Sequence, residues 1–381
     1  MDKVLIVTSD DYTLYQPTIL NLYDFLQKDF EVSIICFEPS FLGRKKDATR
    51  NVIYLQSPFL KRKLSRLVDL CTNAVLKRLD KYLFKFTPRS EWVRRLKYKI
   101  LTDHLKGYNP RHVIAVDIMP LVAAQKVFER SHFLSLEIIS HDSYFKKMDT
   151  ARIQSVIIQN ESRYQYLFND LKLPVFYIQN APFCENIYIH RGTRSHLLWA
   201  GSIVKEFAVF SCLDFIRSHP EYTLFLKGAA NNATREKLQE KYSDLLSNGK
   251  VVVDESYLPA GEYIKYISKF SIGFCFYGWK LIKNNFNYQS APSGKLFMYL
   301  AAGVPVIACN IPAFEFLKEF KAGVLVDDYE PATIYNAIKT IENDYEKYRE
   351  NCYAAAGMFC FDNNAVKFSA HLKKLSENVS T

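Results

Sequence analysis

The chain has 381 residues, which at roughly 150 residues per domain predicts two or three domains. Hydrophobic residues make up 49% and aromatic residues 15%, so the chain can bury ordinary globular cores and is not a disordered polymer. No run approaches the ~18 consecutive apolar residues of a membrane-spanning helix, and acidic residues stand near the N-terminus where a signal peptide carries basic ones, so we expect a cytoplasmic protein.

Short β-branched runs alternate with helical patterns in the first half of the chain. The strands predicted there are Val4–Thr8, Val32–Cys36, Val52–Leu55, Val113–Val116, Leu134–Ile139, Val156–Gln159 and Val175–Ile178. Residues with helical periodicity separate most of these runs. A long basic stretch interrupts the series after the third of them.

Between Phe59 and Lys106 stand fourteen Lys and Arg residues and four acidic ones, so this segment accounts for the net charge of +10. Its apolar residues recur at helical spacing with basic residues between them. The pattern suits a surface that lies against an anionic membrane or an anionic, lipid-linked substrate. It equally suits two ordinary helices whose basic side chains face water. Nucleic acid is not an expected partner, because no helix-turn-helix, zinc-finger or RNP-type signature is present.

The second half repeats the alternation of strands and helices. Its predicted strands are Leu197–Ala200, Tyr222–Leu226, Val251–Val253, Ile272–Phe276, Val306–Ala308 and Val324–Val326. Nearly continuous apolar strands joined by helices indicate parallel sheets covered on both faces. The two series therefore predict an α/β chain with two doubly wound domains.

The polar, turn-prone region Gln179–Ser195 indicates the domain boundary. We expect a first domain at residues 1–182, a second at 183–357, and a C-terminal helix at 358–381 that packs back on the first. Eleven of the 13 glycines follow residue 190, and the first strand is not followed by a G-x-G-x-x-G loop. A dinucleotide-dependent dehydrogenase is therefore not expected.

The eight cysteines contain no C-x-x-C pair, and most stand in apolar, strand-like runs. They are Cys36, Cys71, Cys184, Cys212, Cys275, Cys309, Cys352 and Cys360. This pattern predicts buried, reduced thiols rather than a disulfide framework or a zinc site.

The most informative stretch is Asn287–Asp327, which predicts a helix that starts near Ser293 and Gly294. Lys295 follows in the first turn, where a cation opposes the helix dipole. An anion bound between the lysine and the first N–H groups of the helix would explain this placement, so the segment predicts a phosphate site. The alternative is an ordinary helix start with Lys295 in solvent.

The run from Lys295 to Ala308, KLFMYLAAGVPVIA, resembles the donor-site signature of the GT-B glycosyltransferases, in particular the GT4 group. Leu198–Ser202 and Leu224–Gly228 resemble strands and glycine turns of the donor domain, and they occur in the family's order. The resemblance covers about residues 150–340 well and the first 150 residues poorly.

The resemblance implies two Rossmann-like domains that face each other across a cleft, with a nucleoside-diphosphate sugar on the second and the acceptor on the first. It implies a hexosyltransferase that acts in the cytoplasm on a glycan or lipid-linked glycan acceptor in surface polysaccharide biosynthesis. The basic segment adds the expectation of a peripheral membrane protein. It also implies that neither a cofactor nor a metal is needed, because a helix dipole and lysines can neutralise the diphosphate. No D-x-D motif is present.

The donor-binding residues implied by the resemblance lie in the second domain. They are Gly201, Ser202, Lys205, Lys227, Ser290, Ser293, Gly294 and Lys295. Two departures stand out: Ser202 replaces the arginine of the family, and Met298 and Ser290 replace its paired glutamates. These departures keep two alternatives open, a non-catalytic GT-B homologue that serves as a scaffold or binding subunit, and a GT-B sugar-nucleotide epimerase. They also leave open whether transfer retains or inverts the sugar configuration.

Catalytic candidates on the acceptor side follow strands of the first domain. Asp117 ends one strand, and His141 and Asp142 follow the next. A histidine titrates near neutrality, and a neighbouring carboxylate can tune it for acid–base work. The alternative is turn and helix-cap chemistry. A hydrolase triad that includes Ser9 is disfavoured, because no G-x-S-x-G elbow is present.

Overall fold

The computed structural model describes residues 1–9, 16–38, 46–56, 89–138, 142–169, 171–188 and 192–378. Contacts divide the chain into two compact units. The first comprises Met1–Ile158, Phe168–Tyr177 and Lys367–Thr381, and the second comprises Gln159–Leu167 and Ile178–Val366. The chain passes from one unit to the other after Ile158, Leu167, Tyr177 and Val366.

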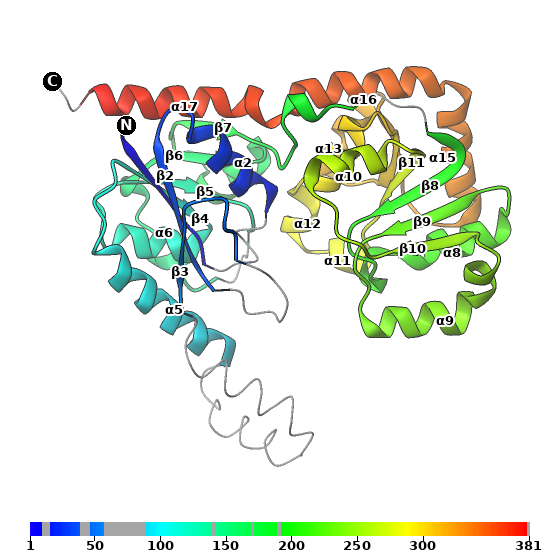
Figure 1. Ribbon diagram of the computed structural model, residues 1–381, viewed down its shortest axis with the longest axis horizontal. Coiled ribbons are helices and arrows are strands. Elements are labelled where there is room, and N and C mark those ends of the chain that lie inside the picture. Colours follow the sequence, from blue (N-terminus) through cyan, green and yellow to red (C-terminus); the bar gives the residue numbers. More distant parts are fainter. Residues whose placement is uncertain are drawn as a thin grey trace, which may run out of the picture. The chain divides into compact units, whose positions relative to one another are not determined.

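The first unit is built on a parallel sheet of seven strands in the order β3-β2-β1-β4-β5-β6-β7 (Figure 1). Its strands are β1 (Lys3–Val7), β2 (Glu31–Phe37), β3 (Val52–Leu55), β4 (His112–Val116), β5 (Ser131–Leu134), β6 (Ile153–Ile158) and β7 (Val175–Tyr177). Its helices are α2 (Pro17–Leu26), α5 (Arg89–Leu105), α6 (Ile118–Gln125) and the short 3-10 turns η1 (Phe145–Lys147) and η2 (Thr150–Arg152). This order is that of a doubly wound α/β domain.

The second unit has a parallel sheet of six strands in the order β10-β9-β8-β11-β12-β13. The strands are β8 (Thr193–Ala200), β9 (Thr223–Lys227), β10 (Val251–Asp254), β11 (Phe270–Cys275), β12 (Val306–Cys309) and β13 (Gly323–Val326). The helices begin with α7 (Glu161–Phe168), η3 (Cys184–Asn186), η4 (Lys205–Phe207), α8 (Val209–Ser218), α9 (Asn232–Ser247), α10 (Ala260–Ile267), α11 (Trp279–Ile282) and α12 (Phe286–Ser290). They continue with α13 (Gly294–Ala301), η5 (Pro312–Phe314), α14 (Phe316–Glu319), α15 (Pro331–Asn343) and α16 (Tyr345–Phe359). The final helix, α17 (Phe361–Glu377), is divided between the two units.

Side chains alternate between two hydrophobic cores along the strands of the second sheet. Leu197 and Trp199 of β8 belong to one core, together with α8, α9 and α15, whereas Leu198 and Ala200 belong to the other, together with α10, α13 and α16. Successive residues of a strand point to opposite faces, so both faces of this sheet are covered. The predicted α/β class with two doubly wound parallel sheets is confirmed.

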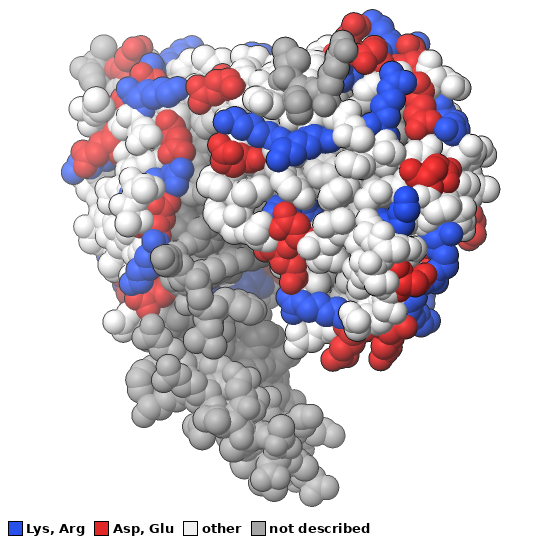
Figure 2. Space-filling model, turned by 45° about the vertical axis from the view of Figure 1, so that its right-hand side comes forward, with Lys and Arg blue, Asp and Glu red and all other residues white. Residues whose placement is uncertain are grey.

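Basic and acidic side chains of the described residues are interspersed on the face shown in Figure 2. Most of the basic segment between Phe59 and Lys106 lies outside the described residues, and only α5 and the turn after it fall within them. Among the residues that the structure describes, no helix is long and apolar enough to cross a membrane.

Three histidines gather where the end of α17 packs within the first unit. The Nε2 atom of His132 lies 3.4 Å from Nδ1 of His112, and its Nδ1 lies 2.8 Å from the hydroxyl of Ser155. The ring of His371 lies 6.1 Å from that of His132. Burial lowers the pKa of all three imidazoles, to about 4 for His112, because a charged ring is poorly solvated there.

We expect this cluster to make the first unit sensitive to mild acid. In the unfolded chain the imidazoles bind protons near pH 6.5, whereas in the folded chain they stay neutral to lower pH, so their contribution to stability is present above pH 6.5 and is lost as the pH falls towards about 4. The measurement is chemical denaturation at a series of pH values. The decline between pH 6.5 and about 4.5 should be shallower in His112→Gln than in His104→Gln, which removes an exposed histidine. Equal slopes in the two variants would disprove the assignment.

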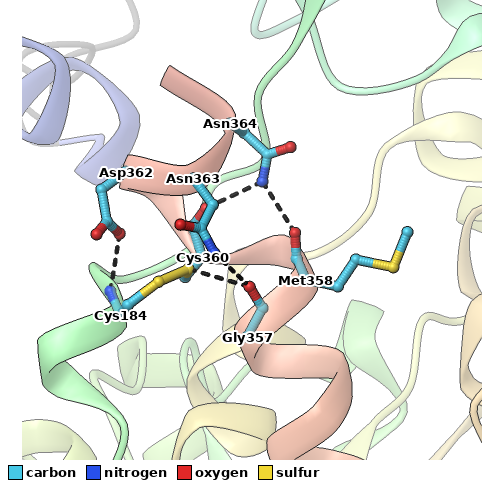
Figure 3. Close-up of a disulfide and its surroundings, with 7 residues drawn as sticks. All are labelled: Cys184, Gly357, Met358, Cys360, Asp362, Asn363 and Asn364. Atoms are coloured by element: carbon cyan, nitrogen blue, oxygen red, sulfur yellow. Dashed lines mark hydrogen bonds between the residues drawn. A yellow bond between two sulfur atoms is a disulfide. The ribbon is translucent and has the colours of Figure 1, made fainter. Parts of the chain in front are cut away.

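One disulfide joins Cys184 of η3 to Cys360, which lies between α16 and α17 (Figure 3). The prediction of reduced thiols was therefore wrong for this pair. The two residues are 176 positions apart in sequence, and only the packing of η3 beside the start of α17 brings them together. The prediction holds for Cys212, Cys275, Cys309 and Cys352, which are free and buried. Cys36 is also buried, and Cys71 lies outside the described residues.

Candidate functional site

The carboxyl ends of β8 and β9 approach each other at two glycines of the second unit. The N–H of Gly201 donates to the carbonyl oxygen of Lys227 at 2.9 Å. A Cβ atom on Gly228 would lie 2.0 Å from the carbonyl oxygen of Gly201, and both glycines have φ in the left-handed region, at 111° and 149°. Only glycine is accommodated at these positions, so the sequence fixes the close turn after β8.

The helix α13 begins beside this turn. A Cβ atom on Gly201 would lie 3.9 Å from Cδ of Lys295, which stands in the first turn of α13. The first N–H groups of a helix have no partner within it, and the side chain of Ser293 makes no capping hydrogen bond to them. Gly294 leaves room for the amide of Asn180, because a Cβ atom there would lie 2.6 Å from Nδ2 of Asn180.

The ammonium group of Lys295 lies among aromatic rings. Its Nζ is 5.0 Å from the ring centre of Trp199, 5.4 Å from that of Phe207 and 5.7 Å from that of Tyr277. No carboxylate in the described part of the chain forms an ion pair with it. Aromatic faces attract a cation but cannot neutralise it. A positive helix end and an uncompensated lysine therefore meet at the carboxyl edge of a parallel sheet, and this arrangement suits a phosphate or diphosphate group.

The structure brings Gly201, Ser293, Gly294 and Lys295 together, as the sequence predicted. Ser202 is exposed just after β8, and Lys205 is exposed at the start of η4.

Lys227 and Ser290 are placed differently from the other predicted donor residues. Lys227 is 1% exposed, and its Nζ lies 2.7 Å from both the carbonyl oxygen and the hydroxyl of Ser256 and 2.8 Å from Oδ2 of Asp254. Lys227 thus holds the end of β9 to the loop after β10. Ser290 is also buried, and its hydroxyl donates to the carbonyl oxygen of Phe286 at 2.7 Å. Both side chains are therefore buried and bonded to neighbouring residues of the second unit, where they stabilise the loops around the site.

Arg163 of α7 supports Ser290 from within the second unit. Its side chain is fully buried, and Nη1 donates to Oγ of Ser290 at 3.1 Å and to Oδ1 of Asn287 at 3.0 Å. Nδ2 of Asn160 donates to the carbonyl oxygen of Ser290 at 2.7 Å. These bonds anchor the segment immediately before α13. The arginine is visible in the sequence, but nothing local in it indicates that its side chain is buried.

We expect Arg163→Met to lower the free energy of unfolding by about 2–4 kcal/mol, because it removes the donor to the buried hydroxyl of Ser290 and to the partly buried amide oxygen of Asn287. Chemical denaturation measures this change. The control is Arg235→Met, which removes an exposed ion pair with Glu255 and should cost about 1 kcal/mol or less. A loss for Arg163→Met no larger than the control's would show that this anchor contributes nothing to stability.

A pocket of about 350 Å³ opens in the first unit at the carboxyl ends of its strands. Its polar lining consists of Ser9, Arg94, Lys97, Asp117, Glu137 and Asp142. The predicted catalytic residues Asp117 and Asp142 therefore face the same pocket, although 25 residues separate them in the sequence. His141 lies outside the described residues.

Two hydrogen bonds fix the position of Asp117. Its φ of 61° lies in the left-handed region, and Oδ1 accepts from the N–H groups of Leu136 at 2.8 Å and Glu137 at 3.0 Å. Asp117 occupies the N-cap position of α6, but its side chain does not cap that helix. A strained aspartate at the mouth of a pocket suggests function rather than simple capping.

The carboxylate of Asp142 is buried and forms an ion pair with Arg94 of α5, and its Oδ1 accepts from the N–H of Tyr144 at 2.9 Å. Lys97 of α5 donates to the carbonyl oxygen of Ser9 at 3.4 Å. Arg94 and Lys97 were counted in the sequence only as part of the basic segment. Carboxylates and cations at one pocket can bind the hydroxyl groups of a sugar, and a carboxylate there can accept a proton.

One group of potential metal ligands occurs within the described ranges. The sulfurs of Cys184 and Cys360 and a carboxylate oxygen of Asp362 lie within 4.8 Å of one another. The disulfide occupies both sulfurs, and Oδ1 of Asp362 accepts from the N–H of Cys184 at 2.8 Å (Figure 3). The disulfide and this hydrogen bond therefore already use both sulfurs and one oxygen of the carboxylate.

No protein-family model and no curated protein sequence match this chain. Solved structures do match along nearly its full length. An α,α-trehalose-phosphate synthase (UDP-forming) from Burkholderia vietnamiensis is 11% identical with a TM-score of 0.66, and the match covers 100% of this chain and 99% of that one. HepE from Anabaena in complex with UDP is 13% identical with a TM-score of 0.64, covering 99% of each chain. Sucrose-phosphate synthase from Thermosynechococcus elongatus is 12% identical with a TM-score of 0.64, covering 100% and 99%.

These similarities, together with the seven- and six-stranded parallel sheets, show that the chain has the GT-B fold. The fold expected from the resemblance is confirmed. At 11–13% identity the similarity identifies the fold and assigns no role to any residue.

Proposed function

We propose that this chain is a glycosyltransferase that takes a sugar from a nucleoside diphosphate and transfers it to a hydroxyl group of an acceptor. The observation that carries the proposal is Lys295, a cation without a carboxylate partner in the described residues, at the N-terminus of α13. The GT-B fold supports the proposal. Two of the similar structures support it as well, because HepE was solved in complex with UDP and the trehalose-phosphate synthase is named as UDP-forming. A uridine diphosphate sugar is accordingly the first donor to test.

In the proposed reaction the diphosphate binds the N–H groups of Gly294 and Lys295 and the Lys295 ammonium. The bond between the sugar carbon and the diphosphate oxygen breaks, and the electron pair leaves with the nucleoside diphosphate. The helix end and the lysine stabilise the negative charge that develops there. The acceptor oxygen forms the new bond to the sugar carbon, and its proton passes to a base, for which we propose Asp117 of the first-unit pocket. None of these steps needs a bound metal ion.

The acceptor we propose is a glycan or a lipid-linked glycan of a surface polysaccharide, and the transferred sugar is a hexose. The basic segment between Phe59 and Lys106 supports a lipid-linked acceptor, because its charge would draw the protein to an anionic membrane surface. Sedimentation with anionic vesicles at low salt tests this part, since surface attraction is strongest there. If the protein does not sediment with the vesicles, the proposed attachment to a membrane surface is wrong.

The test of the activity is the release of nucleoside diphosphate from a panel of nucleotide sugars, measured with and without candidate acceptors. A transferase should release the nucleotide rapidly only when an acceptor is present and should add one sugar to that acceptor, as seen by mass spectrometry. Free sugar formed without an acceptor would indicate an epimerase instead. Nucleotide binding without turnover on any acceptor would support a binding subunit.

A further inference from the structure

A second pocket of the first unit has no role in the proposed reaction. Its volume is about 490 Å³, and its polar lining consists of Tyr98, Gln125, Lys126, Lys147, Asp149 and Arg152. It lies at the end of α6, whereas the pocket with Asp117 lies at the start of that helix.

The lining of this second pocket carries a surplus of positive charge. Three basic side chains face one carboxylate, that of Asp149, and Oδ2 of Asp149 is already within 3.3 Å of Nε of Arg152. Lys126 and Lys147 are exposed, and neither forms an ion pair with a carboxylate among the described residues. The negative end of α6 offsets part of the charge of Lys126. The remaining surplus makes the pocket suitable for an anion.

The backbone around these cations is fixed by reciprocal hydrogen bonds. Nε2 of Gln125 donates to the carbonyl oxygen of Asp149 at 2.7 Å, and Oε1 of Gln125 accepts from the N–H of Asp149 at 3.0 Å. Nη1 of Arg152 donates to the carbonyl oxygen of Gln125 at 2.7 Å. The end of α6 and the start of η2 are thus locked together, so the cations of the pocket are held on a preorganised frame.

Tyr144 contacts a cation of each pocket of the first unit. Its buried ring has Arg94 of the Asp117 pocket at 4.8 Å and Lys147 of the second pocket at 4.8 Å. Tyr98 of α5 packs on the same ring at 5.2 Å and lines the second pocket. The eight residues of α6 span ~12 Å, which sets the scale of the separation between the pockets.

We propose that the second pocket binds a phosphate group, with Lys126, Lys147 and Arg152 as its cationic ligands. Phosphate matches the charge surplus, and it accepts several charge-assisted hydrogen bonds at once. The group belongs to a phosphate ester or diester, either soluble or in a lipid headgroup. This phosphate group can be part of the acceptor, an assignment that rests on the proposed function. The acceptor then places its sugar in the Asp117 pocket and its phosphate group in the second pocket.

The test compares Lys126→Gln/Lys147→Gln with the charge-matched control Lys99→Gln/Lys146→Gln, which removes two exposed lysines outside the pocket. Both are made in the full chain with Lys295→Ala, so that the proposed donor site does not contribute. One arm measures binding of inorganic phosphate by calorimetry against chloride at equal ionic strength. The other arm measures binding to phosphatidylcholine vesicles with and without phosphatidylglycerol.

We expect the pocket variant to bind phosphate at least about tenfold more weakly than the control in one of the two arms, because two charge-assisted contacts are lost. A selective loss with inorganic phosphate identifies a soluble ester, and a selective loss with phosphatidylglycerol vesicles identifies a lipid headgroup. Equal binding by the two variants in both arms, or no binding by the control in either, overturns the proposal.

Nucleotide binding separates this inference from the proposed function. With Lys295 intact, the pocket variant should bind nucleoside diphosphates as the unmodified chain does, because the second unit is unchanged. Absence of nucleotide binding by the unmodified chain would refute the glycosyltransferase proposal and leave the phosphate result standing by itself.

Discussion

Lys295→Ala should weaken binding of the nucleoside diphosphate by about 10- to 100-fold. The substitution removes the cation at the N-terminus of α13, and hydrogen bonds from a charged donor contribute roughly 1.5–3 kcal/mol each. Loss of the ammonium also leaves the rings of Trp199, Phe207 and Tyr277 facing the diphosphate without a charge between them. Isothermal titration calorimetry of the variant and the unmodified chain measures the change.

Two further variants show whether charge is the cause. Lys295→Arg keeps the cation and should retain most of the affinity, whereas Lys241→Ala removes an exposed lysine of α9 and should leave binding unchanged. Unaltered affinity in Lys295→Ala would refute the assignment of the diphosphate to this helix end. Equal losses of affinity in Lys295→Ala and Lys241→Ala would show that the loss reflects the net charge of the protein and not a contact at this helix end.

Asp117→Asn should lower the turnover number of sugar transfer by about 10²- to 10⁴-fold while nucleotide binding stays unchanged. Asparagine has the same shape as aspartate, and its oxygen can still accept from the N–H groups of Leu136 and Glu137, so the pocket should keep its shape. The amide cannot accept a proton as the carboxylate does. Steady-state kinetics with the acceptor identified by the activity panel separates the turnover number from the Michaelis constant of the donor.

The control for this variant is Asp103→Asn, which changes an exposed carboxylate of α5 that is paired with Lys106. Its turnover should match that of the unmodified chain. If Asp117→Asn also turns over normally, Asp117 is not the base. Asp142→Asn is then the next variant, since Asp142 faces the same pocket and is fixed by Arg94.

The fold followed from local periodicity, because every predicted strand run lies in or beside an observed strand. One misplaced strand is instructive. The run Leu134–Ile139 was predicted as a strand, but β5 covers Ser131–Leu134. The strand includes the polar residue His132, whose buried ring hydrogen-bonds to the hydroxyl of Ser155. The strand ends before Leu136, because the N–H of Leu136 donates to the carboxylate of Asp117 and not to a neighbouring strand. Both causes are contacts between distant residues, which periodicity does not reveal.

The candidate site was predictable where it depends on a short segment. Lys295 could be found because a lysine in the first turn of a helix after Ser293 and Gly294 is unusual on electrostatic grounds alone. The role of Lys227 could not be foreseen, because its partners Ser256 and Asp254 lie on a neighbouring strand and the loop after it. The meeting of Arg94 with Asp142 likewise required the packing of α5 in the first unit.

The most direct test of the central claim is a thermal-shift screen of the unmodified chain against UDP, GDP, ADP and CMP and several of their sugar conjugates. A ligand that binds only the folded state raises the melting temperature as its concentration exceeds the dissociation constant. We predict a concentration-dependent rise with one nucleoside diphosphate and its sugar conjugates, and not with the others. No rise with any of them would contradict the assignment of a donor site to the second unit.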